Sequence, residues 1–246
     1  MLLRLIGCDV FTRVICSLAS RSPHVVDVEF VPMLSHNYPD RLRGELQRRI
    51  DSNPSGRAYD AVLLGYGLCG NAIAGLSCPA PLIIPRVHDC CAMFMGSKAR
   101  FDQEFGRAPS TRWCSNGYYE RGYMTGDSSL LMQDVTVYKT NPEYLRLVRE
   151  YGEENAEYAW TTMYPDIETD DSVYIYIDGY EFSGSLEEYT RLVEAKGKVL
   201  RRVEGGLSYL RDLVNGPWDD ERFLTVPPGR RVAPVYDMDT VITSED

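Results

Sequence analysis

The sequence predicts an α/β protein with mostly parallel sheets flanked by helices. We expect two Rossmann-like lobes with a cleft at the carboxyl ends of the strands. Two observations support this class. Short apolar segments alternate with helical patterns along most of the chain. The chain also has 246 residues with 44% hydrophobic content, which is enough to bury a full core.

The first half of the chain shows the alternation directly. A helix is expected at Pro39–Asp51, where "PDRLRGELQRRID" is amphipathic and opens with proline and aspartate. Four apolar segments predict strands: residues 2–7, 25–33, 59–67 and 81–87.

The second half resumes the same pattern after a segment rich in Gly, Tyr and Ser, residues 106–134, which we expect to be irregular. Helices are expected at 141–164, 185–197 and 206–216, and strands at 172–178, 198–205 and 222–227. We therefore divide the chain into an N-terminal lobe, 1–134, which carries the Cys and His motifs, and a C-terminal lobe, 135–246. A single continuous doubly wound sheet would produce the same local patterns.

Charge and hydropathy restrict the partners. A net charge of -10 and a pI near 4.9 disfavour nucleic acid and anionic membrane surfaces, which are bound through basic patches. No apolar run approaches the roughly 18 to 20 residues that span a bilayer. We expect a cytoplasmic protein whose partner is a small molecule or another protein. Seven cysteines, an odd number, favour thiols or metal ligands over a disulfide framework.

Chemically active side chains follow several predicted strands. Cys8 and Asp9 follow the first strand, His36 the second, Cys69 the third, and the run His88 to Cys91 the fourth. Ligands of open parallel α/β sheets bind beyond the carboxyl ends of the strands. These side chains are therefore expected at one edge of a sheet. His36 is interpreted as a helix cap in preference to a ligand.

The stretch "GYGLCGN" contains three glycines, Gly65, Gly67 and Gly70, with Tyr66 between the first two. Glycine allows positive φ angles and a close approach of backbone to a ligand. The spacing is neither the dinucleotide fingerprint nor a Walker loop. We expect either a ligand-contacting loop or a tight turn that requires glycine.

The stretch "PRVHDCCAMF" places His88 and Asp89 at a helix start, with Asp89 as the N-cap and Cys90 and Cys91 in the first turn. The partial positive charge there favours a thiolate. Neighbouring residues on a helix diverge by about 100 degrees, so one of the two thiols is expected to reach the site. Burial as small apolar residues is the alternative.

A metal site follows from these thiols and the imidazole. Cys69, His88 and Cys90, with Cys91 as the alternate and Cys114 from the irregular segment, would form a soft ligand set for zinc, iron or an iron-sulfur centre. The paired C-x-x-C knuckles of structural zinc are absent from the sequence. Such a site would therefore be assembled from distant loops.

Three stretches, "LLGYGLCGN", "IPRVHDCCAMFMGSKARF" and "LVNGPWDDERFLTVPPG", resemble the uncharacterised prokaryotic family known as domain of unknown function 1638. The resemblance covers roughly residues 2–229. It implies an association with corrinoid-dependent methyltransferases of methylamine and betaine metabolism, and no specific activity. The motif positions here are Gly65, Tyr66, Gly67, Cys69, Gly70, Arg86, His88, Asp89, Cys90, Gly96, Ser97 and Lys98.

The first functional hypothesis is a metal-binding protein of one-carbon or corrinoid-linked methyl metabolism, which would work with a corrinoid methyltransferase system protein. With zinc, it would be a metal-dependent methyl- or thiol-transferase that keeps sulfur deprotonated. Arg86 and Lys98 would hold an anionic group, and Asp89 and Lys98 are the catalytic candidates. With an iron-sulfur centre, it would be an accessory or electron-transfer protein.

The second hypothesis is a metal-free, two-lobed binding protein for a small anionic metabolite, with Gly65, Tyr66, Gly67, Gly70 and Arg86 around the ligand. A third hypothesis is a thiol-nucleophile enzyme that uses Cys90 with His88. Metal content separates the first hypothesis from the other two.

Overall fold

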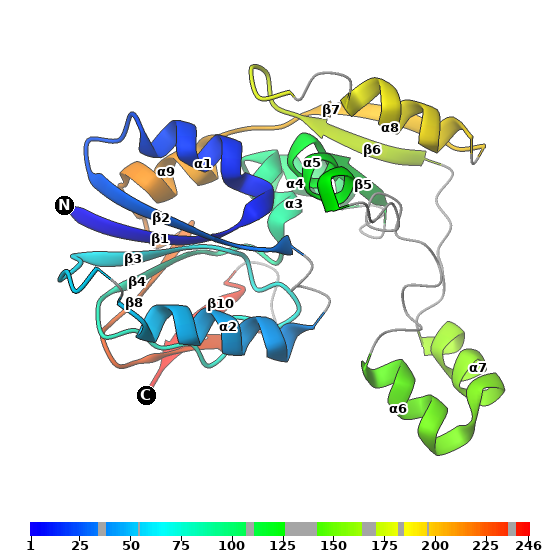
Figure 1. Cartoon of the computed structure of the whole chain (residues 1–246), viewed down its shortest axis with the longest axis horizontal. Helices are drawn as coiled ribbons and strands as arrows, with labels where there is room; N and C mark the ends of the chain where they lie inside the picture. The colour runs from blue at the N-terminus through cyan, green and yellow to red at the C-terminus, as the bar shows by residue number, and fades with distance from the viewer. Residues whose placement is uncertain are drawn as a thin grey trace. The chain divides into compact units, whose positions relative to one another are not determined.

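The protein is an α/β protein in its computed structural model, as the sequence predicts (Figure 1). The structure describes residues 1–33, 38–53, 55–106, 111–125, 142–163, 171–181, 185–195, 197–235 and 240–246. Helices in this part of the chain are all too short or too polar to cross a membrane.

A five-stranded sheet is the centre of the first compact unit. Its order is β2 (Val25–Val31), β1 (Leu2–Cys8), β3 (Ala61–Gly65), β4 (Leu82–Pro85) and β8 (Phe223–Val226). The first four strands are parallel and β8 is antiparallel to β4. Every residue of β3 and β4 is buried, as expected of parallel strands covered on both faces.

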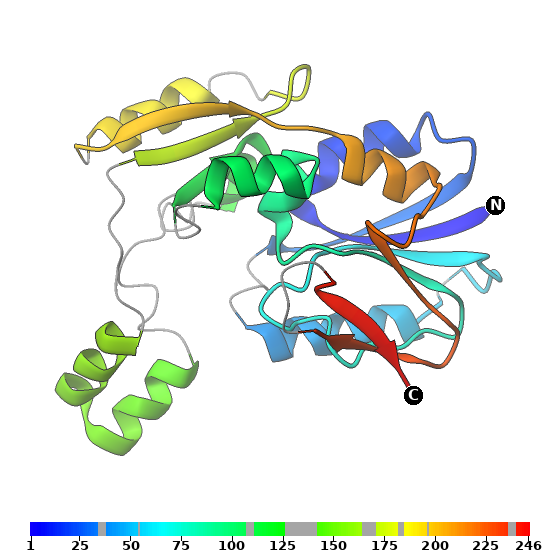
Figure 2. The same ribbon diagram turned by 180° about the vertical axis from the view of Figure 1, so that it is seen from behind.

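Helices cover both faces of this sheet (Figures 1 and 2). α1 (Thr12–Ala19) and α9 (Ser208–Asn215) contact each other on one face, and α2 (Pro39–Asp51) covers the other. The α2 helix has the predicted bounds, with Pro39 in its first turn and Leu42, Leu46 and Ile50 buried at helical spacing.

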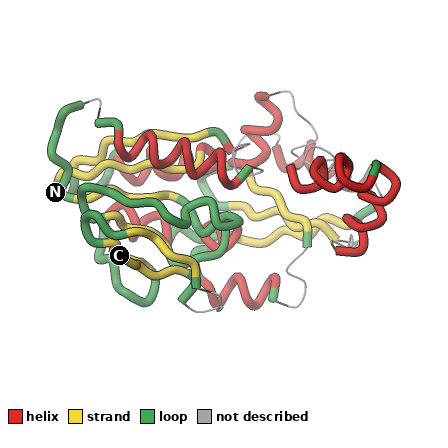
Figure 3. Tube along the Cα trace, turned by 90° about the horizontal axis from the view of Figure 1, so that it is seen from below, coloured by secondary structure: helices red, strands yellow, loops and turns green. Residues whose placement is uncertain are grey.

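The remaining elements of the first unit follow β1, β4 and β8. α3 (Cys90–Met95) and α4 (Lys98–Phe105) come after β4, and a short 3-10 helix, Asp9–Phe11, follows β1. An antiparallel hairpin of β9 (Arg231–Pro234) and β10 (Ile242–Glu245) ends the chain. Both termini lie on the same side of this unit (Figure 3).

The second compact unit contains a sheet of three strands in the order β5 (Arg112–Ser115), β6 (Asp171–Tyr176) and β7 (Val199–Glu204). α5 (Asn116–Thr125) and α8 (Ser185–Glu194) contact each other beside it. The aromatic rings of Tyr119, Tyr174 and Tyr189 form its core. A helical hairpin of α6 (Pro142–Tyr151) and α7 (Glu153–Met163) packs through Tyr144, Leu147 and Ala156.

The two units interleave in sequence. The first comprises residues 1–107, 176–180 and 204–246, and the second 108–175 and 181–203. The lobe boundary expected at residue 134 lies outside the described residues, within 126–141. The C-terminal segment that carries α9, β8 and the hairpin therefore belongs to the same unit as β1 to β4.

Two local predictions were wrong. The segment expected to be irregular contains β5 and α5, and its Tyr119 is buried in the core of the second unit. The helix expected over 141–164 is two helices separated at Gly152, whose φ of 81° is the left-handed conformation that ends a helix.

Candidate functional site

The carboxyl ends of β1, β3 and β4 bring most of the predicted site residues together within the first unit. These strands are adjacent, with Gly7 opposite Gly65 and Leu63 opposite Ile83. Cys8 ends β1, Tyr66 follows β3, and His88 follows β4 by three residues. This is the edge at which open α/β sheets bind ligands.

The loop after β3 is packed against the segment after β4. The amide of Leu68 donates to the carbonyl of Val87 at 2.9 Å, and the amide of Cys69 donates to that of His88 at 2.8 Å. A Cβ at Gly67 would lie 2.7 Å from the oxygen of Val87. Gly67 is therefore required by the close approach of two backbone segments. Gly65 similarly faces the Cα of Gly7, which a Cβ would meet at 3.1 Å.

The next turn has an unusual backbone. Cys69, Gly70 and Asn71 have φ angles of 46°, 65° and 68°, so three successive residues are in the left-handed region. Glycine adopts this region without cost, whereas Cys69 is strained by its Cβ. Strained residues of this kind concentrate at functional sites. The backbone of Cys69 in this conformation is hydrogen-bonded to the segment that carries His88.

Asp89 is the N-cap of α3, as predicted. Its carboxylate accepts from the amides of Cys91 at 2.9 Å and Ala92 at 3.3 Å. These first-turn amides are therefore occupied within the chain. Burial raises the pKa of Asp89 above its ordinary value. The two adjacent thiols diverge as expected: Cys91 is buried and Cys90 is half-buried.

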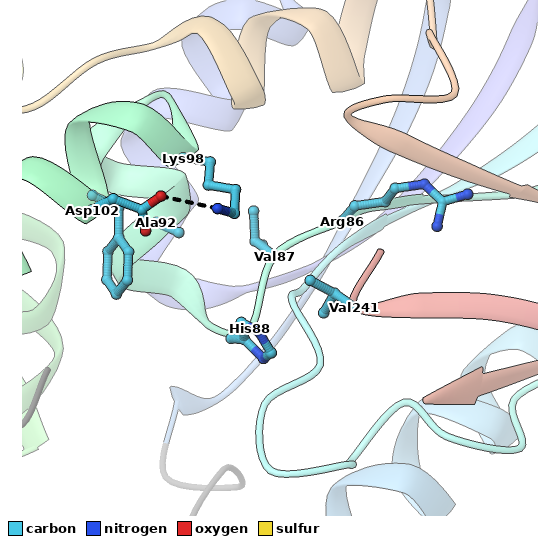
Figure 4. A pocket seen from close by; sticks show the side chains of 8 residues that line it. Arg86, Val87, His88, Ala92, Lys98, Asp102 and Val241 are labelled. Carbon is cyan, nitrogen blue, oxygen red and sulfur yellow. Dashed lines mark hydrogen bonds and ion pairs between the residues drawn. The ribbon is translucent and has the colours of Figure 1, made fainter. Parts of the chain in front are cut away.

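A pocket lies beyond the end of β4 (Figure 4). Its cavity volume is about 20 Å³, room for about one water-sized group. Its walls are mostly apolar, and its polar side chains come from the segment after β4 and from α4. Its wall includes Val87, His88, Ala92, Lys98, Phe101 and Val241.

His88 lines this pocket and has a ring nitrogen that is unpaired within the described chain. Its Nε2 is buried and has no hydrogen-bond partner among the residues that the structure describes. A buried polar atom without a partner costs free energy on the order of 1–3 kcal/mol. A bound hydrogen-bond partner would remove this cost.

Lys98 lies across the pocket from His88 at the start of α4 (Figure 4). Ser97 caps this helix by accepting from the amide of Arg100 at 3.2 Å. The Lys98 ammonium is 2.9 Å from a carboxylate oxygen of Asp102, one turn later, and both groups line the pocket. The pocket therefore contains a charge pair that an ionic ligand can engage.

The guanidinium of Arg86 points away from Lys98 (Figure 4). Its Nε donates to the carbonyl of Asp220 at 2.8 Å, and its Nη1 donates to those of Thr240 and Ile242. These donors hold the C-terminal hairpin against the end of β4. The predicted direct contact of Arg86 with an anion stays a prediction.

Burial favours the protonated form of three thiols at this edge, those of Cys8, Cys69 and Cys91. Burial, and then the negative charge of Asp89, raises the pKa of Cys69 to about 12. Burial also raises the pKa of Cys8 and Cys91. The N-terminal helix charge therefore does not produce a thiolate at Cys91. A metal would have to displace these protons.

Two of the proposed metal ligands, Cys69 and His88, are adjacent within the first unit. Cys69 and His88 are joined through the backbone, whereas Cys114 is buried in β5 of the second unit. Within the described residues, no group of three His, Cys, Asp or Glu side chains is arranged to hold a metal. His36 lies outside the described residues. The metal set therefore stays a prediction.

A family model described as "Protein of unknown function (DUF1638)" matches residues 30–214. The chain belongs to this family. No curated protein and no solved structure matches the chain. In this member of DUF1638, the matched region contains the loop after β3, His88 and Lys98, while Cys8 and Val241 lie outside it.

Sequence reasoning missed several pocket residues of this DUF1638 protein. Asp102 follows Lys98 by four residues, a helical spacing that predicts an ion pair. Phe101 has no comparable signal, because an aromatic residue on a helix is usually core. Val241 is far from the motifs in sequence, and only the fold brings it to the pocket.

Proposed function

We propose that this protein binds a small anionic molecule at the pocket beside His88. The observation that carries the proposal is the buried Nε2 of His88, a residue that lines the pocket, which has no partner in the described chain. A ligand oxygen that accepts from this nitrogen would remove the cost of leaving it unpaired.

Two further features favour an anionic group on the ligand. Lys98 provides a positive charge in the pocket and forms a pair with Asp102. An entering carboxylate can share the three donors of the ammonium. Because the cavity has room for about one water-sized group, it would take only the anionic end of the ligand, while Val87, Ala92 and Phe101 offer apolar contacts to the carbon atoms next to it.

The test is a titration with named probes: formate, acetate, propionate, butyrate and inorganic phosphate, followed by amide chemical shifts. We expect at least one probe to shift the amides of His88 and Lys98. His88→Ala and Lys98→Gln should each lower the affinity for that probe by about 10-fold to 100-fold. This is the contribution of a hydrogen bond to a charged group.

The matched control is His24→Ala. His24 precedes β2 at the opposite edge of the same sheet, and its Nε2 lies 3.3 Å from the carbonyl of Asn215. This variant should bind like the wild type. Binding that is equally strong in the His88 and Lys98 variants would contradict the proposal.

A soft metal ion is the second candidate, favoured by one observation: the 2.8 Å hydrogen bond that joins Cys69 to His88 holds a thiol and an imidazole on neighbouring loops. The described residues give too few ligands for the four-coordinate site that zinc prefers. We therefore rank it below the metal-free site. The one-carbon and methyltransferase setting rests on the family resemblance alone.

Elemental analysis separates the two candidates. Protein purified without oxygen and without added metal is compared with Cys69→Ser and Cys90→Ser. About one zinc or iron per chain, lost in both variants, would replace the anion site with a metal site. A metal-free wild type whose variants bind the probes normally favours the anion site.

A further inference from the structure

We propose that Val241 sets the size of ligand that the His88 pocket accepts, and that Arg86 is the positioning residue that holds it in place. This inference rests on the proposed function. It assigns a specificity-determining residue outside the region that the family model matches.

Val241 is a buried pocket wall in a strained conformation. Its side chain is 1% exposed and lines the pocket near His88 (Figure 4). Its φ is 58°, in the left-handed region, where a β-branched residue is a genuine outlier. Such a conformation persists only where the surrounding structure enforces it.

Backbone hydrogen bonds enforce part of this conformation. The amide of Ile242 donates to the carbonyl of Thr240 at 2.6 Å, which closes a three-residue turn around Val241. The carbonyl of Val241 itself accepts from the amide of Val235 at 2.8 Å, across the hairpin. The turn is therefore fixed between β9 and β10.

Arg86, at the end of β4 beside the pocket, provides the other hydrogen bonds that hold this turn. Its Nη1 donates to the carbonyls of Thr240 and Ile242, the two residues on either side of Val241. Arg86 immediately precedes Val87 and His88 of the pocket wall. One side chain thus ties the position of Val241 to that of His88.

The consequence is a pocket whose depth is set by the volume of residue 241. Removing methyl groups there opens space next to His88, and adding one closes it. A buried methylene contributes about 0.8 kcal/mol, which corresponds to about fourfold in affinity. The chain length of the preferred probe should therefore follow the size of residue 241.

The experiment measures the dissociation constants of formate, acetate, propionate and butyrate for the wild type, Val241→Ala and Val241→Ile. We expect Val241→Ala to raise the affinity for butyrate relative to that for formate by about fourfold to sixteenfold, because the substitution removes two carbon atoms from the pocket wall. Val241→Ile should lower the ratio of butyrate affinity to formate affinity by about fourfold. Val232→Ala is the control, because Val232 is an equally buried valine of β9; its ratio should stay unchanged.

Arg86→Gln tests the positioning role. It should move the butyrate-to-formate ratio toward that of Val241→Ala although residue 241 is intact, and Arg86→Lys should restore part of the wild-type ratio. General destabilisation of the fold would not change the ratio of the two affinities, and Val232→Ala measures the effect of destabilisation alone. Wild-type binding with the same ratio in all variants would overturn this inference alone. No binding of any carboxylate to the wild type would overturn the proposed function and this inference with it.

Discussion

Gly67 is the residue at which the candidate site depends most directly on backbone packing. A Cβ there would meet the backbone oxygen of Val87 at 2.7 Å and the nitrogen of Asp89 at 2.9 Å. Neither atom belongs to a flexible side chain. We expect Gly67→Ala to lower the free energy of unfolding by about 2–3 kcal/mol, the cost of overpacking, as measured by urea denaturation.

Gly44 is the control for this substitution. It lies in the interior of α2, and a Cβ there would meet nothing within 4 Å. Gly44→Ala should raise stability by about 0.5–1 kcal/mol, because alanine loses less conformational freedom in a helix. Equal effects of the two substitutions would contradict the close approach at Gly67.

Asp89 gives a prediction about pH. Because burial raises its pKa in the folded state, the fold binds a proton at Asp89 more tightly than the unfolded chain does. The stability from this protonation is present below the ordinary pKa of 3.8 and is lost as the pH rises through the raised value. Asp89→Asn should keep the N-cap and remove this loss. The free energy of unfolding of the variant, relative to that of the wild type, should therefore increase as the pH rises.

Asp89→Ala separates the cap from the charge. It removes the acceptor of the Cys91 and Ala92 amides and should cost about 1 kcal/mol. Urea denaturation of the three proteins at a series of pH values checks both effects. A stability difference between Asp89→Asn and the wild type that does not change with pH would contradict the charge effect.

At the residue scale, local chemistry decided what the sequence could predict. The N-cap role of Asp89 was predicted because it depends on the next three residues alone. The partners of Arg86 are more than 130 residues away in sequence, at Asp220, Thr240 and Ile242. No local pattern reports such a contact, so its role came from the structure.

At the scale of elements, an ion-pair network joins β1, β2 and α2. Buried Arg4 contacts Glu29 at 2.8 Å, and Arg49 contacts the other oxygen of Glu29 at 2.6 Å. Glu29→Gln would leave Arg4 buried without its charged partner. We expect a loss of about 2 kcal/mol, below the roughly 3–5 kcal/mol of a fully buried pair because Glu29 is partly exposed.

Asp40→Asn is the matched change of carboxylate to amide. Asp40 pairs with Arg43 at 2.9 Å, and its side chain is 94% exposed. Exposed pairs of this kind contribute less than about 1 kcal/mol. Urea denaturation should rank the two variants in that order, and equal losses would show that the Arg4 network contributes no more than an exposed pair.

The elements of the first half were predicted well because their periodicity is strong and uninterrupted. The strands at 2–7, 25–33, 59–67 and 81–87 and the helix at 39–51 were confirmed. The helix over 141–164 was wrong because its apolar period continues past Gly152. Gly152 followed by Glu153 and Glu154 is typical of one helix ending and another beginning, and here this local signal outweighs the apolar period.

At the scale of the whole molecule, the fold class follows from the alternation of strands and helices, whereas the pairing of distant segments does not. A strand shows its apolar pattern in sequence but not its partner. β8 pairs with β4 across more than 130 residues, and α9 packs on α1. The C-terminal segment therefore returns to the first sheet, and it brings Val241 to the pocket.

This return of the chain leads to a prediction about cooperativity. Phe223 begins β8, is fully buried, and lies opposite Pro85 of β4. Phe223→Ala should cost about 3–5 kcal/mol. Because residues 204–246 belong to the same compact unit as β1 to β4, hydrogen exchange should show the loss of protection in the amides of β1, β3 and β4, although these strands lie far away in sequence.

Ile175→Ala is the counterpart in the second unit. Ile175 is fully buried in β6 and pairs with Ser115 of β5. In the Ile175→Ala variant, the loss of protection from hydrogen exchange should be largest in the amides of β5 and β6. If Phe223→Ala reduced protection only in β8 and its neighbours in sequence, the C-terminal segment would not be an integral part of the first unit, and a wall of the His88 pocket contributed by that segment would lose its structural basis.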